Sequence, residues 1–239
     1  MNSTPLRLFI IRHGETKWSQ TGRHTGGSDI PLTKRGEQEA REIGVRLRTV
    51  EFSKIFTSPL QRAKRTCELA EPDKAVTTDS DLSEWNYGDY EGKKSSDIRK
   101  DCPNWDLFRD GCPAGESPRQ VAARADRIIV RLRLRVGNYA LFTHGQFGAV
   151  LAMRWIGLPI ADAEHFPLGT GSVSILAYAS RHSDVPVVTR WNEPSRRSYD
   201  IGVYPREEID NACEPQAIER WETDKSEITG VGTAATPMY

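Results

Sequence analysis

The amino-acid sequence predicts an α/β fold, in which a mainly parallel β-sheet is flanked by helices on both faces. Short apolar runs typical of buried strands alternate with longer amphipathic stretches typical of helices. The length of 239 residues, with 37% hydrophobic and 28% charged residues, suits one large α/β domain with a polar surface. Two of the predicted strands end in a histidine followed by a glycine, which indicates where chemistry is to be sought.

The first half of the chain predicts three strands, each followed by a loop or a helix. The predicted elements are a strand at 6–11, a loop at 12–32, a helix from 34 to about 50, a strand at 53–57, a helix at 59–69, a strand at 75–78 and a mostly irregular region at 81–118 with one helix near 93–101. Thr33 is the expected N-cap of the first helix. Ser58 is the expected N-cap of the second, with Pro59 at its first position.

The second half predicts the remaining helices and strands of the same domain. They are a helix at 118–136, a strand at 139–143, a helix at 147–156 that is stopped by Gly157, and a closing pair of strands at 172–178 and 186–191. We expect residues 1–195 to form one domain. Residues 196–239 are expected to form a partly irregular C-terminal extension with one helix near 206–222.

Charge and composition exclude several classes of protein. Basic and acidic residues number 33 each, whereas nucleic-acid-binding proteins commonly carry a basic excess, so no nucleic-acid partner is expected. The apolar run Leu8 to Ile11 is far too short for a signal peptide or a membrane span, so no membrane partner is expected. None of the four cysteines forms a C-x-x-C pair, and we expect reduced thiols in a cytoplasmic protein.

The two histidines at strand ends predict a site for an anion. Arg12, His13 and Gly14 follow the first strand, and His144 and Gly145 follow another. Carboxyl ends of parallel strands meet at one edge of a sheet, so both imidazoles are expected in one pocket. An arginine grips phosphate or carboxylate with its fork of donors, and a glycine lets the backbone approach an anion closely.

Three further motifs accompany these strand ends. The segment 57–66 places Arg62 in the first turn of a helix that follows a strand. The segment 82–92 puts Glu84 among aromatic residues in a loop. His24-Thr25-Gly26 offers a hydroxyl group and a flexible backbone in the first long loop.

With these motifs in this order, the chain resembles the histidine phosphatase superfamily, whose phosphoglycerate mutase-like fold is a three-layer sandwich. The matching patterns are R-H-G-E-T at 12–16, S-x-x-x-R-A-x-x-T at 58–66, L-x-E-x-x-x-G-x-x-E-G at 82–92 and T-H-G at 143–145. The resemblance implies that His13 is the nucleophile, which takes the phosphoryl group as a phosphohistidine. It also implies a proton donor to the leaving group, Glu84, and a set of phosphate-binding residues: Arg12, Arg62, His144, Ser19, Thr25 and Gly26. Ser19 stands where many members have asparagine.

The chemistry of phosphate esters explains these residue types. A neutral imidazole avoids the repulsion that an anionic nucleophile would meet, and a phosphohistidine divides one hard displacement into two easier ones. One nitrogen of His13 must attack while a backbone carbonyl fixes the proton on the other. Because fixed cations supply the charge, neither a metal ion nor a cofactor is expected. The charge of a bound phosphate would favour the protonated form of Glu84, which could then donate a proton and later activate water.

Three functions remain open, and a phosphatase is favoured. Members of the superfamily are hydrolases or mutases, and mutases close their site with a long insertion between the acid and the second histidine. His144 follows Glu84 by only 60 positions, so that insertion is absent. A phosphoglycerate mutase is the alternative. A non-catalytic phospho-ligand or protein-binding module is the third reading, against which the intact set of catalytic residue types weighs.

The middle of the chain is similar to the fungal sedoheptulose-1,7-bisphosphatase branch of the family, on the residues 84–92 and 105–117. That resemblance implies a small sugar phosphate or bisphosphate as substrate and partner. The candidate residues of the substrate pocket are His24 (where this branch has a tyrosine), Trp85, Tyr87, Arg109 and Gln146. Ordinary packing or turn roles for these residues are an equal alternative. Association of identical chains is left open.

Overall fold

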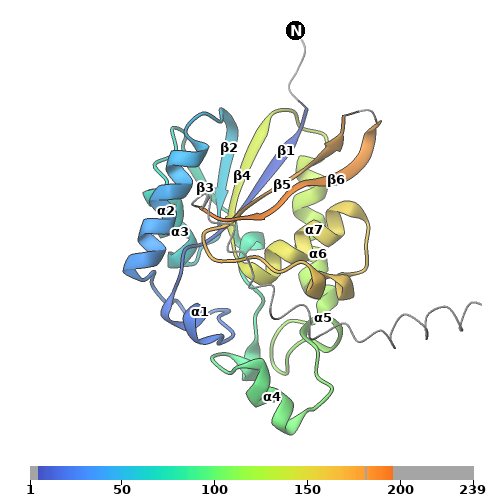
Figure 1. Cartoon of the computed structure of the whole chain (residues 1–239). Coiled ribbons are helices and arrows are strands. Elements are labelled where there is room, and N and C mark those ends of the chain that lie inside the picture. The colour runs from blue at the N-terminus through green and yellow to red at the C-terminus, as the bar shows by residue number, and fades with distance from the viewer. Residues whose placement is uncertain (1–4, 181, 196–239) are drawn as a thin grey trace, which may run out of the picture. The chain divides into compact units, whose positions relative to one another are not determined.

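A six-stranded sheet between two layers of helices forms the core of the computed structural model, which describes residues 5–180 and 182–195 (Figure 1). The strand order is β3-β2-β4-β1-β5-β6. The strands are β1 (Arg7–Arg12), β2 (Phe52–Thr57), β3 (Val76–Thr78), β4 (Asn138–Thr143), β5 (Val173–Ala179) and β6 (His182–Glu193). The first four strands in the order run parallel, and β5 and β6 are antiparallel additions at one edge. The predicted, mainly parallel sheet is thereby confirmed.

Helices cover both faces of this sheet, as the sequence predicts. The helices α2 (Lys34–Leu47) and α3 (Gln61–Leu69) lie on one face, and α6 (Pro118–Leu132) and α7 (Gly145–Ile156) lie on the other (Figure 1). The remaining helices are short: α1 (Lys17–Thr21), α4 (Ser95–Asp101), α5 (Leu107–Asp110) and the 3-10 turns Ser80–Leu82, Gly88–Tyr90 and Ile160–His165. In Figure 1, α1, α4 and α5 lie below the sheet, beyond the carboxyl ends of β1 and β4.

Alternation along the central strand divides the apolar core into two halves. Leu8 and Ile10 pack into the cluster formed with α6 and α7, whereas Phe9 and Ile11 pack into the cluster formed with α2. Successive side chains of a strand point to opposite faces, so an unbroken apolar run is what a strand covered on both faces requires. All four side chains are buried.

The register of β1 against β4 brings the two histidines together. Arg12 lies opposite Thr143 in this parallel pair, so His13 and His144 each leave the sheet at the same level. The backbone N–H of His13 donates to the Thr143 carbonyl at 3.0 Å and extends the ladder by one bond. The edge of the sheet that was predicted to hold the site is thus built by adjacent strands.

Some predicted boundaries are corrected. Thr33 caps α2, and its hydroxyl accepts from the Gly36 N–H at 3.1 Å, as expected. Ser58 does not cap α3, which begins at Gln61 with Leu60 as the N-cap. The Ser58 hydroxyl instead accepts from the Leu60 N–H at 3.3 Å and from Nε2 of His144.

Two further helix predictions differ from the structure. The helix predicted to reach residue 136 ends at Leu132, because Leu134 and Val136 follow with a two-residue period and stay exposed. Helix α1 lies inside the predicted loop 12–32, where Thr16 and Ser19 form a capping box. The expected helix near 206–222 lies outside the described residues. Within 5–180 and 182–195, no helix combines the length and apolar content that crossing a bilayer requires.

Candidate active site

A cavity of about 450 Å³ opens at the carboxyl ends of β1 and β4. Many of the predicted site residues line it: Arg12, His13, Ser19, His24, Thr25, Glu84, Tyr87 and Gln146. They come from the strand end, the first loop, the aromatic loop and the start of α7, so distant parts of the sequence converge here. The volume lies in the range usual for small-molecule sites.

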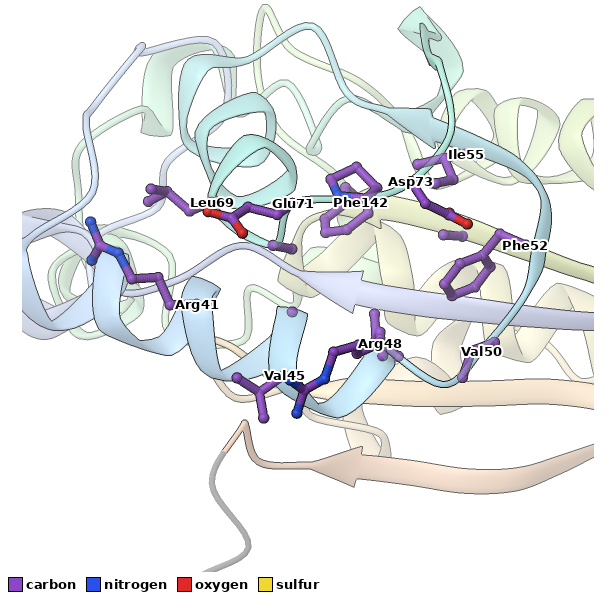
Figure 2. A pocket seen from close by; sticks show the side chains of 15 residues that line it. Arg41, Val45, Arg48, Val50, Phe52, Ile55, Leu69, Glu71, Asp73 and Phe142 are labelled. Carbon is purple, nitrogen blue, oxygen red and sulfur yellow. The ribbon is translucent and has the colours of Figure 1, made fainter.

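A second cavity, of about 390 Å³, lies beside α2 and has a different character. Figure 2 shows its wall, to which the apolar side chains of Val50, Phe52 and Phe142 contribute together with Arg41 and Arg48. None of its lining residues is a histidine, and none belongs to the predicted site. The chemistry of the molecule therefore has to be sought in the first cavity.

His13 is held as a neutral imidazole with one nitrogen available. Its Nδ1 lies 2.7 Å from the Gly14 carbonyl oxygen, to which an N–H must donate, so the proton sits on Nδ1. Its Nε2 has no hydrogen-bond partner among the described residues and keeps its lone pair. Burial, followed by the charges of Arg62 and Arg12, lowers the pKa of His13 well below its usual value. The ring is therefore uncharged at neutral pH.

His144 lies 5.1 Å from His13 between ring centroids but is bonded differently. Its Nδ1 accepts from Nε of Arg62 at 3.2 Å, which places the ring proton on Nε2, where it donates to the Ser58 hydroxyl at 2.8 Å. The side chain is fully buried and does not line the cavity. Burial, then Arg62 and His13, lowers the pKa of His144 well below its usual value, so this imidazole is neutral too.

Arg62 is fully buried and held mainly by the backbone of the first loop. One Nη1 N–H donates to the Ser28 carbonyl at 3.0 Å, and Nη2 donates to the Thr25 and Gly26 carbonyls, both at 2.9 Å. With the bond to His144, four of the five guanidinium N–H groups are engaged. Arg62 thus ties the first loop to the second histidine.

Arg12 carries a donor that the described residues leave unmatched. Its Nη1 donates to the Leu168 carbonyl, while its buried Nε has no hydrogen-bond partner in the structure. Desolvation by burial lowers the pKa of Arg12, and the charge of Glu84 opposes this effect. Buried polar groups are rarely left without a partner, and Arg12 lines the cavity, so its Nε–H is available to an anionic ligand.

Glu84 approaches the first turn of α7 from the side of the aromatic loop. One carboxylate oxygen accepts from the backbone N–H of Phe147 at 2.8 Å, and the other accepts from Gln146 at 3.0 Å. The positive end of the helix dipole favours a negative charge at this place. The Glu84 carboxyl group lines the cavity together with His13, so a nucleophilic nitrogen and a group able to exchange a proton face the same space.

Comparison with known proteins agrees with this geometry. The family model for the histidine phosphatase superfamily (branch 1) matches residues 8–194. The chain belongs to the histidine phosphatase superfamily. An acid phosphatase from Mycobacterium tuberculosis is 39% identical over 176 residues, which cover 72% of this chain and 86% of that protein. A sedoheptulose 1,7-bisphosphatase from Saccharomyces cerevisiae is 30% identical, over 79% of this chain and 93% of that protein.

A solved structure supports the fold of this histidine phosphatase. The structure of an open reading frame product from Mycobacterium tuberculosis superposes with a TM-score of 0.75 at 33% identity, and the match covers 82% of this chain and 100% of that chain. The fold is thus the phosphoglycerate mutase-like α/β fold that the sequence predicts. The protein is a phosphatase of a phosphorylated metabolite.

The first loop of the phosphatase surrounds the cavity, but its predicted residues are used unequally. The Ser19 hydroxyl donates to the Thr16 carbonyl at 2.9 Å within the cap of α1, although the residue lines the cavity. Thr25 lines the cavity and donates its hydroxyl to the Arg23 carbonyl. Gly26 does not line it, and its N–H donates to Glu91 at 2.9 Å. The prediction that Gly26 binds phosphate is corrected, because this N–H is already engaged.

His24 and Tyr87 form an aromatic wall of the cavity. Their rings stack with centroids 4.6 Å apart, and Nε2 of His24 lies 3.1 Å from the Ser95 hydroxyl. Burial, assisted by Arg99, lowers the pKa of His24 to about 4, so this imidazole is neutral under ordinary conditions. Burial raises the pKa of Tyr87 well above its usual value. Both side chains line the cavity and are uncharged at neutral pH.

Two predicted pocket residues lie elsewhere. Trp85 is 0% exposed, packs against Phe108 and donates its Nε1–H to the Glu116 carbonyl, so it is a core residue. Arg109 is exposed on α5 and forms an ion pair with Asp110 at 2.8 Å. Neither residue lines the cavity. The sequence does not show whether an aromatic residue next to Glu84 lines a pocket or packs in the core. It also does not show whether an arginine in a turn-rich loop lines a pocket or lies on the surface.

Sequence reasoning missed two cations of the cavity wall. Arg23 comes from the first loop, directly before His24, and Arg99 comes from α4. Both line the cavity with His13 and Arg12. Only their positions in the sequence could have indicated this role. Arg23 directly precedes the predicted pocket residue His24, and Arg99 lies in the helix predicted within the irregular region 81–118.

Proposed function

We propose that this phosphatase hydrolyses a small phosphate monoester without a metal ion, through a phosphohistidine formed on Nε2 of His13. The observation that carries the proposal is the state of this ring. Its Nδ1–H is fixed on the Gly14 carbonyl, its Nε2 lone pair is available, and its pKa is lowered. A neutral, oriented imidazole is the nucleophile that an anionic phosphate ester accepts.

In the proposed first step, Nε2 of His13 bonds to phosphorus as the bond from phosphorus to the leaving oxygen breaks. Protonated Glu84 gives its proton to that oxygen, so the alcohol leaves neutral and the carboxylate remains. In the second step, this carboxylate takes a proton from water, whose oxygen attacks phosphorus. The bond to His13 breaks, and inorganic phosphate is released.

The charge of the transferring group would be balanced by residues already at the site. Arg12 offers the buried Nε–H that has no partner in the structure. Arg62 keeps one N–H beyond those used for the loop and His144, and a phosphate oxygen could replace Ser58 as the acceptor for His144. Fixed cations and dipoles of this kind supply much of the stabilisation in phosphoryl transfer, which supports a reaction without metal.

A small sugar phosphate or bisphosphate is the substrate class that we propose. It is supported by the likeness to a sedoheptulose 1,7-bisphosphatase and by the size of the cavity. Hydrolysis is favoured over mutase activity by the short interval between Glu84 and His144. A location in the cytoplasm stays a prediction from the sequence.

The proposal is tested with p-nitrophenyl phosphate in the presence and absence of EDTA. We expect the same rate in both, and acid-labile phosphate on the protein after rapid quenching, because a phosphohistidine is the intermediate. His13→Ala should carry no label, whereas His165→Asn, at an exposed histidine outside the cavity, should behave as the wild type. Loss of activity with EDTA would refute the metal-free reaction, and a labelled His13→Ala would refute the assignment of the nucleophile.

A second measurement separates the phosphatase from a mutase. With 3-phosphoglycerate and a trace of 2,3-bisphosphoglycerate, a phosphatase releases free phosphate. Isomerisation to 2-phosphoglycerate without free phosphate would favour the mutase instead. Neither product, together with no turnover of p-nitrophenyl phosphate, would favour the binding module.

A further inference from the structure

The outer part of the catalytic cavity holds a pair of cations that the reaction at His13 does not use. Arg23 precedes the aromatic wall residue His24, and Arg99 lies on α4. Both line the cavity that also contains Arg12, His13 and Glu84. Both side chains are exposed to solvent, as a substrate-binding rim requires.

The guanidinium groups of Arg23 and Arg99 make few contacts with other polar groups in the described part of the protein. Among the described residues, the Arg23 side chain has no hydrogen bond or ion pair. Arg99 donates only its Nε–H, to the Trp105 carbonyl at 3.2 Å, which orients the group and leaves both terminal nitrogens without partners. Other arginines are paired with carboxylates, as in Arg124–Glu116, Arg127–Asp81 and Arg154–Asp126. Further exposed arginines that lack an ion pair in the described structure lie outside this cavity, among them Arg48, Arg119, Arg133 and Arg135.

Two acidic residues of the same cavity do not neutralise this pair. The Asp106 carboxylate caps α5 and accepts from the backbone N–H groups of Phe108 and Arg109 at 2.9 and 3.0 Å. Glu164 lies 3.6 Å from the His165 ring. No ion pair joins either carboxylate to Arg23 or Arg99 in the described structure. The positive charge of the rim is therefore available to a ligand.

The backbone holds the two arginines on adjoining segments. The N–H of His24 donates to the Lys93 carbonyl at 2.9 Å, and the N–H of Gly92 donates to the His24 carbonyl at 2.9 Å. Arg23 forms an isolated antiparallel bridge with Lys94, directly before α4. The first loop and the start of α4 are thus fixed to one another, and Arg23 and Arg99 are presented by a connected frame.

We propose that Arg23 and Arg99 bind a second anionic group of the substrate, a phosphate or a carboxylate, while the first phosphate lies at His13. The inference rests on the proposed function and narrows its substrate to doubly anionic metabolites. Guanidinium groups match both kinds of anion through paired N–H donors. Because these arginines do not contact the reacting phosphate, they determine affinity and specificity and leave the chemical step to the inner residues.

The test compares matched ligands on the full chain. Two pairs are used as inhibitors of p-nitrophenyl phosphate hydrolysis: fructose 1,6-bisphosphate against fructose 6-phosphate, and 3-phosphoglycerate against glycerol 3-phosphate. The first pair reports a preference for phosphate, and the second a preference for carboxylate. In the wild type, at least one doubly anionic member should bind about tenfold more tightly than its counterpart, as expected for charge-assisted hydrogen bonds.

The double variant Arg23→Gln, Arg99→Gln should lose that preference, so that the two members of each pair inhibit p-nitrophenyl phosphate hydrolysis within about twofold of one another. Arg109→Gln, which removes an exposed arginine outside the cavity, is the matched control and should keep the preference. Absence of a preference in the wild type, or its survival in the double variant, overturns the proposal.

The same ligands titrated calorimetrically into His13→Ala separate this inference from the proposed function. A preference for the doubly anionic ligands in this variant confirms the rim site without any turnover. If the wild type then forms no phosphohistidine, the proposed reaction fails while the anion site stands. If the wild type turns over and His13→Ala shows no preference, the reaction stands and the rim site fails.

Discussion

The ends of β1 and β4 place a histidine and a glycine at equivalent positions, yet the two histidines are bonded in opposite ways. His13 fixes one ring nitrogen on the adjacent carbonyl of Gly14 and leaves the other without a partner. His144 engages both nitrogens, one with Arg62 and one with Ser58. The same pattern at two strand ends therefore yields one available nucleophile and one fixed, buried group. The two rings differ in the partner of Nε2: in His13 this atom has none among the described residues, whereas in His144 it donates to the Ser58 hydroxyl.

Substituting each histidine in turn should have the largest effect and should separate the roles of the two strand ends. His13→Ala should lower kcat by more than about 10³-fold and abolish the phosphoenzyme, because the attacking atom is lost. His144→Ala should lower kcat less, by about 10- to 100-fold, and still form phosphoenzyme. The rates are followed with p-nitrophenyl phosphate and the intermediate by acid quench. Equal losses of kcat, with no phosphoenzyme in either variant, would show that the two histidines are functionally equivalent.

Substitution of Glu84, whose carboxylate accepts from the first turn of α7, should have a smaller effect. Glu84→Gln should slow hydrolysis of an alkyl phosphate by about 10²-fold or more, because an alkoxide leaving group needs a proton. Hydrolysis of p-nitrophenyl phosphate should fall much less in the first step, since p-nitrophenolate leaves without one. Burst kinetics separates the two steps. An equal reduction of the first step on both substrates would mean that Glu84 is not the proton donor.

The two glycines give a third contrast, now in stability. A Cβ on Gly14 would lie 2.1 Å from the Gly36 carbonyl oxygen, so Gly14→Ala should lower the free energy of unfolding by about 1–3 kcal/mol or more. A Cβ on Gly145 would lie 3.1 Å from the Arg12 guanidinium carbon, which belongs to a side chain. Gly145→Ala should therefore cost less stability and lower kcat/KM through Arg12. Urea denaturation and kinetics measure both, and the reverse order would contradict the packing described.

The smallest expected effect concerns a property that the two histidines share. Both have pKa values lowered well below 6.5, so the unfolded chain binds more protons than the folded one as the pH falls through 6.5. Stability should thus fall on acidification, by about 1 kcal/mol per histidine between pH 6.5 and 5.5. His144→Gln should reduce this dependence, because one of the two buried imidazoles is removed. A steeper pH dependence of stability in His144→Gln would contradict the lowered pKa of His144.

The residues around His13 could be predicted from the sequence because the carboxyl ends of neighbouring parallel strands lie side by side. Once 6–11 and 139–143 are recognised as parallel strands, His13 and His144 must meet at one edge of the sheet. The family motifs then supply Arg62 and Glu84, whose places depend on the same strand–helix units. The fold class could be predicted for the same reason, since apolar runs and amphipathic stretches record which faces are buried.

The outer part of the site could not be predicted in this way. Arg23 and Arg99 are brought to the cavity by backbone bonds between loops, such as that from His24 to the Lys93 carbonyl, and such bonds leave no periodic trace in the sequence. Trp85 was misplaced because the Glu116 carbonyl accepts from its Nε1–H at 2.9 Å, which allows the ring to be fully buried. Arg109 was misplaced because its neighbour Asp110 pairs with it at the surface.

The way Arg62 is anchored has a consequence for how this scaffold can diversify. The loop holds it through the main-chain carbonyls of Thr25, Gly26 and Ser28, and every amino acid possesses such a carbonyl. Side chains at 23–25 can therefore be exchanged while the support for the buried arginine and its histidine stays in place. The position of Arg62 is thus independent of the side chains with which the same loop lines the cavity.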